Sequence, residues 1–283
     1  MDVHVRAPTL NRNPVNAVIS ASVQGLALIL ANRRLLASIT RVELQKKYAG
    51  SVLGLGWVFL QPALLLCVYL FIYLIVFDVR FPGFSTFDYV LYVFCGLVPY
   101  LGFMEALTTG GLSIRQNIHL VKNVMLPIEL VPVRAVIVGM TSQFVSLALV
   151  ILMLAGSGDL TLHILWLPIV IVLQLLMLIG LTWMLAAVTV ALPDVTYFVN
   201  LFVFLLMFLS PIGFRVEMVP PNFTWVVHLN PVYYMIEIYR DSMLNGTWPK
   251  PLDAAVFTAG SLLAFALGAT FFRAFKGVLV DFE

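Results

Sequence analysis

The sequence predicts an all-α polytopic membrane protein with six transmembrane helices, an N-terminal amphipathic interfacial helix and re-entrant external helices between spans five and six. Hydrophobic residues make up 61% of the 283 residues and charged residues 11%, whereas soluble domains average about 45–50% and about 25%. Mean hydropathy is +1.02, and several uncharged runs approach the roughly 20 residues that cross a bilayer as a helix. These observations exclude a soluble globule, a disordered chain and a nucleic-acid-binding protein.

Residues 1–56 form the predicted cytoplasmic N-terminal segment. Within it, the uncharged run 17–31 is only about 15 residues long, which is short for a span, and it contains Ser20, Ser22 and Gln24. Apolar residues recur in this run at helical spacing, and several basic residues follow it. We therefore predict an amphipathic helix lying on the membrane rather than a seventh span.

Residues 57–275 form the predicted transmembrane domain, and residues 276–283 a cytoplasmic tail. The six spans are long apolar runs between charged residues: 57–77, 89–109, 133–155, 164–191, 195–214 and 254–272. Glu105 is the only carboxylate well inside a span. An ionisable group there is a functional candidate by default, but its place near the end of the span fits structural pairing with a neighbouring helix at least as well.

Lysine and arginine residues set the orientation of the spans. Of the 16 in the chain, twelve fall on the side that contains the N-terminal segment, the loop between spans two and three, and the C-terminus. The four on the opposite side are Arg80, Arg215, Arg240 and Lys250. Cytoplasmic loops of membrane proteins carry the excess of positive charge, so we predict that both termini are cytoplasmic.

The sequence lacks motifs of catalysis and metal binding. It contains no glycine-rich phosphate loop for ATP and no His-Glu-x-x-His zinc motif, and its four histidines are scattered. Cys67 and Cys95 fall in apolar runs, which predicts two buried small hydrophobes rather than a disulfide or a metal pair. We therefore expect no catalytic residue, no metal site and no cofactor in this chain.

The approach to the first span, residues 41–57, is a basic helix followed by small residues. Lys46, Lys47 and Trp57 would anchor it at the membrane surface. Gly50 and Gly54 would let helix backbones approach closely. Taken alone, this segment is explained by anchoring.

The loop between spans two and three, residues 110–132, contains a second amphipathic pattern. Ser113 is a candidate N-cap for a short helix, Arg115 and Lys122 lie on its polar face, and Pro127 ends it. Helices of this kind usually rest on lipid head groups, so the loop alone does not indicate a partner.

The segment after span five is aromatic and apolar, unlike an ordinary solvated loop. Pro211 is expected to break the fifth helix before it leaves the membrane. Residues 232–244 have helical periodicity, but Glu237, Arg240 and Asp241 exclude a stable span. We predict that this segment dips into the outer leaflet and returns, which requires cover by protein or a water-filled cavity.

Aromatic residues recur at helical spacing on two spans. Tyr69, Tyr73 and Phe77 share one face of span one, and Phe204 and Phe208 share one face of span five. A phenol facing lipid in the middle of a bilayer is disfavoured, so the tyrosines should face protein or a pore. Such stripes usually serve packing; the alternative is a path for sugar rings, which stack on aromatic faces.

In this order, the three segments resemble the permease subunit of polysaccharide-exporting ABC transporters, the type that moves O-antigen or teichoic acid chains. The resemblance covers about residues 20–275. The matching residues are Lys46, Tyr48, Ser51, Leu53, Gly54 and Trp57 before span one, Asn117, Leu120, Val121, Lys122 and Pro127 in the loop, and 209–212, Asn230, Pro231 and Arg240 after span five. Leu126 departs from the pattern, because an aromatic residue is common before this proline.

The resemblance implies a homodimer of this chain with two separate ATPase subunits, which bind ATP and magnesium, in the bacterial inner membrane. The implied cargo is a lipid-linked polysaccharide, O-antigen first, with no nucleic acid involved. The resemblance also assigns three groups of residues. These are Arg115, Asn117, His119, Leu120 and Lys122 for coupling to the ATPase, Pro211, Asn230, Pro231, Tyr234 and Arg240 for the external gate, and Tyr69, Tyr73, Phe77, Phe204 and Phe208 for the translocation path.

Three other functions fit the composition. An ABC exporter for drugs or lipids would share the fold without the sugar path. A membrane-embedded polyprenyl-phosphate transferase would need clustered carboxylates for a metal ion, which the sequence lacks. A purely structural membrane subunit is the third.

Overall fold

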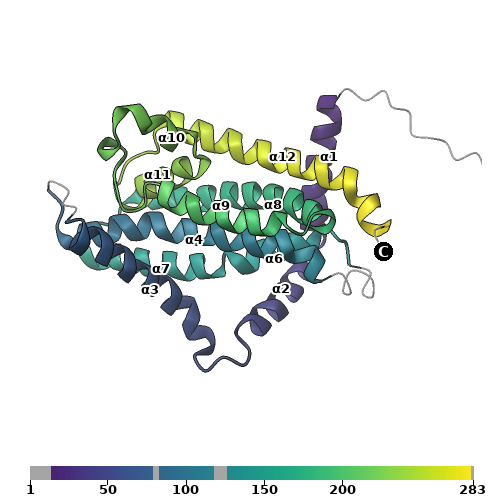
Figure 1. Ribbon diagram of the computed structural model, residues 1–283, viewed down its shortest axis with the longest axis horizontal. Coiled ribbons are helices and arrows are strands. Elements are labelled where there is room, and N and C mark those ends of the chain that lie inside the picture. Colours follow the sequence, from purple (N-terminus) through teal and green to yellow (C-terminus); the bar gives the residue numbers. More distant parts are fainter. Residues whose placement is uncertain (1–13, 79–82, 118–125, 282–283) are drawn as a thin grey trace, which may run out of the picture.

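The computed structural model describes residues 14–78, 83–117 and 126–281 (Figure 1). Across those ranges the chain forms helices joined by turns, with no strand. In the same ranges five helical segments are long and apolar enough to cross a membrane: Trp57–Val76, Thr86–Gln116, Leu130–Ser157, Leu162–Ala191 and Pro251–Gly277. They overlap predicted spans one to four and six, and the fifth is a shorter apolar helix, α9 (Val195–Leu209). The all-α polytopic membrane class is therefore confirmed.

The first described residues form two helices that leave the main bundle. α1 (Pro14–Ala31) and α2 (Arg33–Tyr48) meet at a bend of 69°. Figure 1 shows α1 running across one end of the bundle rather than along it, which is the direction expected of a helix on a membrane surface. α1 packs against α12, and α2 against α6. We call this end of the bundle the α2 end.

α3 and α4 form the first two spans. α3 (Trp57–Leu70) continues into a π-helical segment, Phe71–Val76. α4 (Thr86–Gln116) begins with a capping box, in which the Ser85 hydroxyl accepts from the Asp88 N–H and the Asp88 carboxylate accepts from the Ser85 N–H. α4 contacts α6, α7, α8, α9 and α11, so it is the central helix of the bundle.

α4 is longer than predicted and includes Ser113, the predicted N-cap of a separate short helix. Its hydroxyl donates to the Gly110 carbonyl at 2.7 Å from within α4, so that prediction is wrong. Packing on α8 explains the continuous helix. A Cβ on Gly110 would lie 2.4 Å from Cγ2 of Thr182, and the Thr189 hydroxyl donates to the Gly111 carbonyl. Tertiary contacts here override local capping preference.

The third and fourth spans are interrupted helices. α6 (Leu130–Gly139) and α7 (Thr141–Ser157) are separated by one residue, Met140, and a 3₁₀ turn (Leu162–Trp166) precedes α8 (Leu167–Ala191). α8 packs most extensively on α12 (Pro251–Asp281). A Cβ on Gly268 of α12 would lie 2.1 Å from the Gly180 carbonyl oxygen, so only glycine allows this close crossing.

The segment between α9 and α12 folds back into the bundle. α9 ends at Leu209 rather than at 214, because Pro211 cannot continue the helix. Two 3₁₀ turns follow, then α10 and α11: Val216–Met218, Pro221–Phe223, Thr224–Leu229 and Pro231–Met243. α11 packs against α4, α8 and α12. This protein cover is what a re-entrant helix requires, and we call this end the α11 end.

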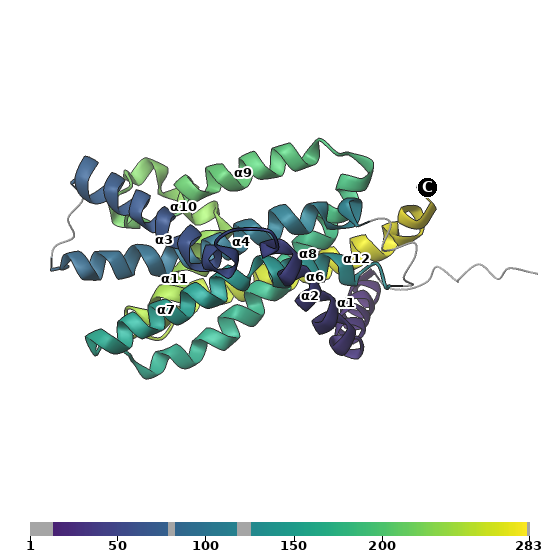
Figure 2. The ribbon, with the colours of Figure 1, turned by 90° about the horizontal axis from the view of Figure 1, so that it is seen from below.

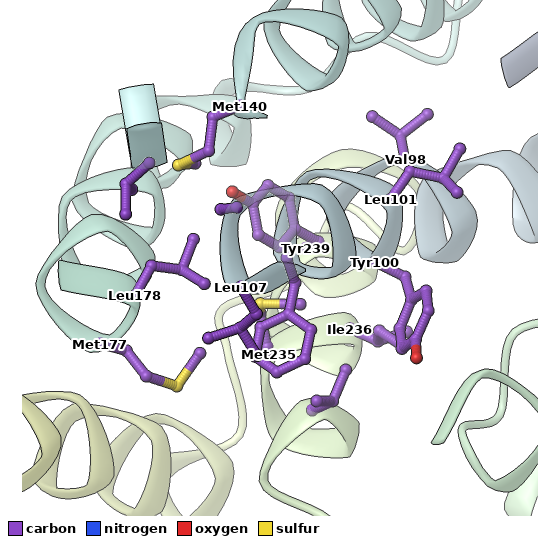
Figure 3. Close-up of a cluster of buried hydrophobic side chains, with 14 of the residues drawn as sticks. Val98, Tyr100, Leu101, Leu107, Met140, Met177, Leu178, Met235, Ile236 and Tyr239 are labelled. Carbon is purple, nitrogen blue, oxygen red and sulfur yellow. The ribbon is translucent and has the colours of Figure 1, made fainter. Parts of the chain in front are cut away.

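α11 also supplies part of the hydrophobic core. Figure 3 shows Met235, Ile236 and Tyr239 of α11 among buried side chains of α4 and α8, including Leu107 and Leu178. A helix that carries an ion pair is thus inserted among spans, with its apolar face inward. This position brings its polar residues against α4 and the end of α9.

Candidate functional site

The irregular segment 210–215, which follows α9, is held by two tyrosines of α4. Tyr89 donates its hydroxyl to the Gly213 carbonyl at 2.7 Å, and Tyr92 donates to the Phe214 carbonyl at 3.0 Å. A non-helical backbone at membrane depth needs partners for its carbonyls, since lipid offers none. The tyrosines therefore fix this segment against α4.

Arg240 of α11 joins the same segment from the other side. Its side chain is 1% exposed; Nη2 donates to the Ile212 carbonyl at 2.8 Å, and Nη1 pairs with Glu237 at 2.9 Å. The guanidinium carbon lies 3.7 Å from the centre of the Tyr92 ring, a cation–π contact. Gly96 permits this approach, because a Cβ there would lie 2.8 Å from Nη2. A buried charge is thus paired, hydrogen-bonded and stacked.

Asn230 links the start of α11 to the end of α9. Its side-chain carbonyl accepts from the Val232 N–H at 3.0 Å, which caps α11, and its amide donates to the Ser210 hydroxyl at 2.8 Å. Pro231 occupies the first position of α11, where its missing N–H is not needed. We call Ser210–Arg215, Tyr89, Tyr92, Asn230 and Arg240 together the α9–α11 latch.

The structure brings four of the five predicted gate residues together in or beside this latch. Pro211, Asn230, Pro231 and Arg240 lie there, whereas the Tyr234 hydroxyl donates to the His228 carbonyl of α10 at 2.9 Å. The sequence analysis missed Tyr89 and Tyr92. The available signal was the phenol itself, since each hydroxyl in an apolar span needs a partner.

The five predicted path residues divide into enclosed and open positions. Tyr69 and Tyr73 stack with ring centres 5.8 Å apart, and Tyr69 is only 6% exposed. The Tyr69 hydroxyl is buried and has no hydrogen-bond partner within the described ranges. Phe77 is 64% exposed, and Phe204 and Phe208, in edge contact at 5.3 Å, are 51% and 53% exposed. Both tyrosines therefore face protein, while the phenylalanines remain open in the single chain.

A buried polar cluster, also missed in the sequence, joins four helices. Gln143 of α7 and Gln174 of α8 hydrogen-bond to each other through both side-chain amides at 2.8 and 3.0 Å. Tyr239 of α11 donates to Gln174 at 2.6 Å, and Gln174 donates to the Pro99 carbonyl of α4 at 3.2 Å. The cluster is satisfied, so it holds α11 at a fixed depth.

Ion pairs attach α2 to the spans. Lys47 pairs with Glu105 of α4, and the Ser142 hydroxyl donates to the other Glu105 oxygen at 2.9 Å. Arg134 of α6 lies 3.6 Å from Glu43 of α2. Burial lowers the pKa of Lys47, but the hydrogen bond and charge of Glu105 raise it, and the net shift is upward. Glu105 thus has the structural pairing that its position suggested.

Two of the five predicted coupling residues lie in the described part of the chain. Arg115 is exposed on the last turn of α4, and the Asn117 amide donates to the Ser113 carbonyl at 2.8 Å where α4 ends. His119, Leu120 and Lys122 lie outside the described residues. Arg115 and Asn117 belong to the α2 end, where a cavity of about 210 Å³ is lined by Asn117 and by both α2 ion pairs.

The structure corrects one prediction about the cysteines. Cys95 is buried, whereas Cys67 is exposed on α3. An apolar residue in a membrane protein can face lipid, so apolarity alone does not predict burial. Among the described residues, no group of three or more His, Cys, Asp or Glu side chains could hold a metal ion.

Comparison with known proteins identifies similar sequences over most of the chain. The family described as ABC-2 type transporter matches residues 34–244. Two Klebsiella pneumoniae proteins named O-antigen export system permease protein RfbA are 25% and 26% identical over 245 and 244 residues, each covering 86% of this chain and 92% of the relative. A Myxococcus xanthus protein of the same name is 28% identical over 236 residues, 82% of this chain and 89% of the relative.

Proposed function

Because the chain belongs to the ABC-2 type transporter family, we propose that this multi-pass membrane transport subunit exports a lipid-linked polysaccharide, with O-antigen as the leading candidate. The observation that carries the proposal is similarity to three O-antigen export permeases over 82–86% of the chain. The membrane would be the bacterial inner membrane, with both termini in the cytoplasm. The distribution of lysine and arginine supports this orientation.

The export path would run between two copies of this chain. Phe77, Phe204 and Phe208 are open in the single chain, and a second copy would supply the facing wall. Aromatic faces stack on sugar rings, so a glycan would slide along them. The α9–α11 latch would close the path at its external end, because it fixes the irregular backbone of 210–215 directly after α9.

Energy would come from a separate ATPase, two copies of which would bind ATP and magnesium. The sequence lacks a phosphate loop, which fits a division of labour between subunits. Arg115, at the exposed end of α4, and the loop that follows would contact the ATPase. Movement there would reach the latch through α4, which spans from Arg115 to Tyr89.

A deletion strain tests the proposed cargo. Loss of this chain should remove the surface polysaccharide and leave its lipid-linked precursor inside the cell, and the wild-type chain should restore export. Co-purification with an ATPase would test the assembly. Unchanged surface polysaccharide, with altered efflux of a drug or a lipid, would instead assign the chain to the exporters of those compounds.

A further inference from the structure

A crevice of about 300 Å³ lies at the α2 end, between α1, α8 and α12. Its lining is divided by chemistry. The apolar walls are formed by Leu28, Trp183 and Phe272, and the charged rim is formed by Glu129, Arg273 and Lys276. The crevice is separate from the α9–α11 latch, which lies at the α11 end (Figure 1).

The apolar and charged groups are arranged in order along α12. Ala269 and Phe272 are 6% and 1% exposed, whereas Arg273 and Lys276, each four residues further along the helix, are exposed. The Trp183 indole N–H donates to the Glu129 backbone carbonyl at 3.0 Å, which keeps the Glu129 carboxylate at the rim. Apolar walls below a cationic rim match the order of acyl chains below a phosphate head group.

Two polar groups at the rim retain binding capacity. Lys276 donates to one Glu129 oxygen at 2.5 Å, but the other, Oε2, is buried and has no hydrogen-bond partner among the described residues. Arg273 is exposed and takes part in none of the ion pairs found within the same residues. A ligand that fits must therefore bring an anion for Arg273 and a hydrogen-bond donor for Glu129.

We propose that this crevice binds an anionic glycerophospholipid with a hydroxyl-bearing head group, for which phosphatidylglycerol is the probe. Its phosphate would face Arg273 and Lys276, a head-group hydroxyl would donate to Glu129, and an acyl chain would lie against Trp183 and Phe272. Basic pockets between helices on the cytoplasmic side of a membrane suit anionic head groups. The lipid would hold α1 against α12.

The bound lipid belongs to the surrounding bilayer and not to the transported cargo. Figure 2 shows α1 on the opposite side of the bundle from α9, which carries Phe204 and Phe208. The proposal therefore stands independently of what the protein exports.

Native mass spectrometry of the purified full chain, with phosphatidylglycerol or phosphatidylcholine added, tests the site. The wild type should retain phosphatidylglycerol in preference, since choline offers no hydrogen-bond donor to Glu129. Arg273→Gln should weaken phosphatidylglycerol binding about fivefold, the effect of one basic residue near an anionic lipid surface. Arg34→Gln, which removes an exposed charge on α2 outside the crevice, is the matched control and should bind as the wild type does.

A second variant tests the crevice without changing its charge. Gly25 of α1 lines the crevice, and a Cβ there would lie 3.1 Å from the Trp183 ring, so Gly25→Leu should fill the space and reduce lipid retention. Equal binding of both lipids, or wild-type binding by Arg273→Gln or Gly25→Leu, would overturn the proposal. So would tighter, Arg273-dependent binding of a polyprenyl phosphate, which would assign the crevice to the cargo.

Discussion

Arg240 shows what a single charged residue needs in order to be kept within a membrane bundle. Its guanidinium is 1% exposed and has a carboxylate, a backbone carbonyl and an aromatic ring as partners. The planar guanidinium of arginine can contact several such partners at once, whereas the ammonium of lysine concentrates its charge at one point. The residue therefore ties α11 to the end of α9 by geometry as well as by charge.

Replacing Arg240 by lysine should weaken the α9–α11 latch while keeping the charge. Lysine cannot hold Glu237 and the Ile212 carbonyl in the same geometry, so we expect a loss of about 2 kcal/mol in stability and impaired export. Thermal unfolding in detergent and an export assay measure the two effects. Arg41→Lys, at an exposed position on α2, is the control, and equal behaviour of both variants would contradict the role of the latch.

Substitutions at Tyr69 distinguish a packing role of this side chain from a role in transport. Because the Tyr69 hydroxyl has no partner in the described residues, Tyr69→Phe should leave the unfolding temperature unchanged or raise it slightly. Tyr69→Ala should cost about 3 kcal/mol through the cavity it leaves. Reduced export by Tyr69→Phe, at unchanged stability, would show that the hydroxyl contacts the cargo; unchanged export would leave this tyrosine a packing residue and remove it from the path.

At the scale of helices, the apolar runs predict where spans exist better than where they end. The spans require only runs of apolar residues, and five long apolar helices and the shorter α9 overlap the predicted runs. The extension of α4 through Ser113 depends on Gly110 packing against Thr182, a contact between residues distant in sequence. Local capping rules contain no information about it.

The candidate site was predictable in part for the same reason. Pro211, Asn230 and Pro231 have local effects on helix ends, and the sequence identifies them. Tyr89 and Tyr92 act on carbonyls 124 and 122 residues away, so no local pattern reveals their partners. Long-range pairing is the information that the linear pattern lacks.

The attachment of α2 can be tested by exchanging charges. Lys47 and Glu105 are 27% and 18% exposed, so Lys47→Glu should cost about 1–2 kcal/mol after allowing for solvent screening. The double variant Lys47→Glu/Glu105→Lys should recover part of that loss. Thermal unfolding of the wild type, of Lys47→Glu and Glu105→Lys alone, and of the double variant measures the coupling, and strictly additive losses would show that the pair contributes nothing.

The end of α4 should transmit the action of the ATPase. Reversing the charges of Arg115 and Lys122 should uncouple ATP hydrolysis from export, while the protein still inserts and folds, because Arg115 is exposed. Hydrolysis and export are measured on the same assembled transporter. Full export at normal expression would mean that this segment only rests on the membrane.

For the whole molecule, the predicted orientation assigns the two ends of the bundle to opposite sides of the membrane. Single cysteines at Lys47, Lys122 and Lys276, in a chain without Cys67 and Cys95, should resist an impermeant thiol reagent in intact cells. Cysteines placed in residues 216–250 should react. Labelling at position 122 in intact cells would overturn the orientation.

The central place of α4 has a consequence for the time course of biosynthesis. Gly213 follows Tyr89 by 124 residues, so at about 5–20 residues per second it is synthesised roughly 6–25 s later. For about that long, α4 exists without the carbonyls that its tyrosines will bind. A translational pause before residue 213 would lengthen the interval in which these two hydroxyls lack their partners.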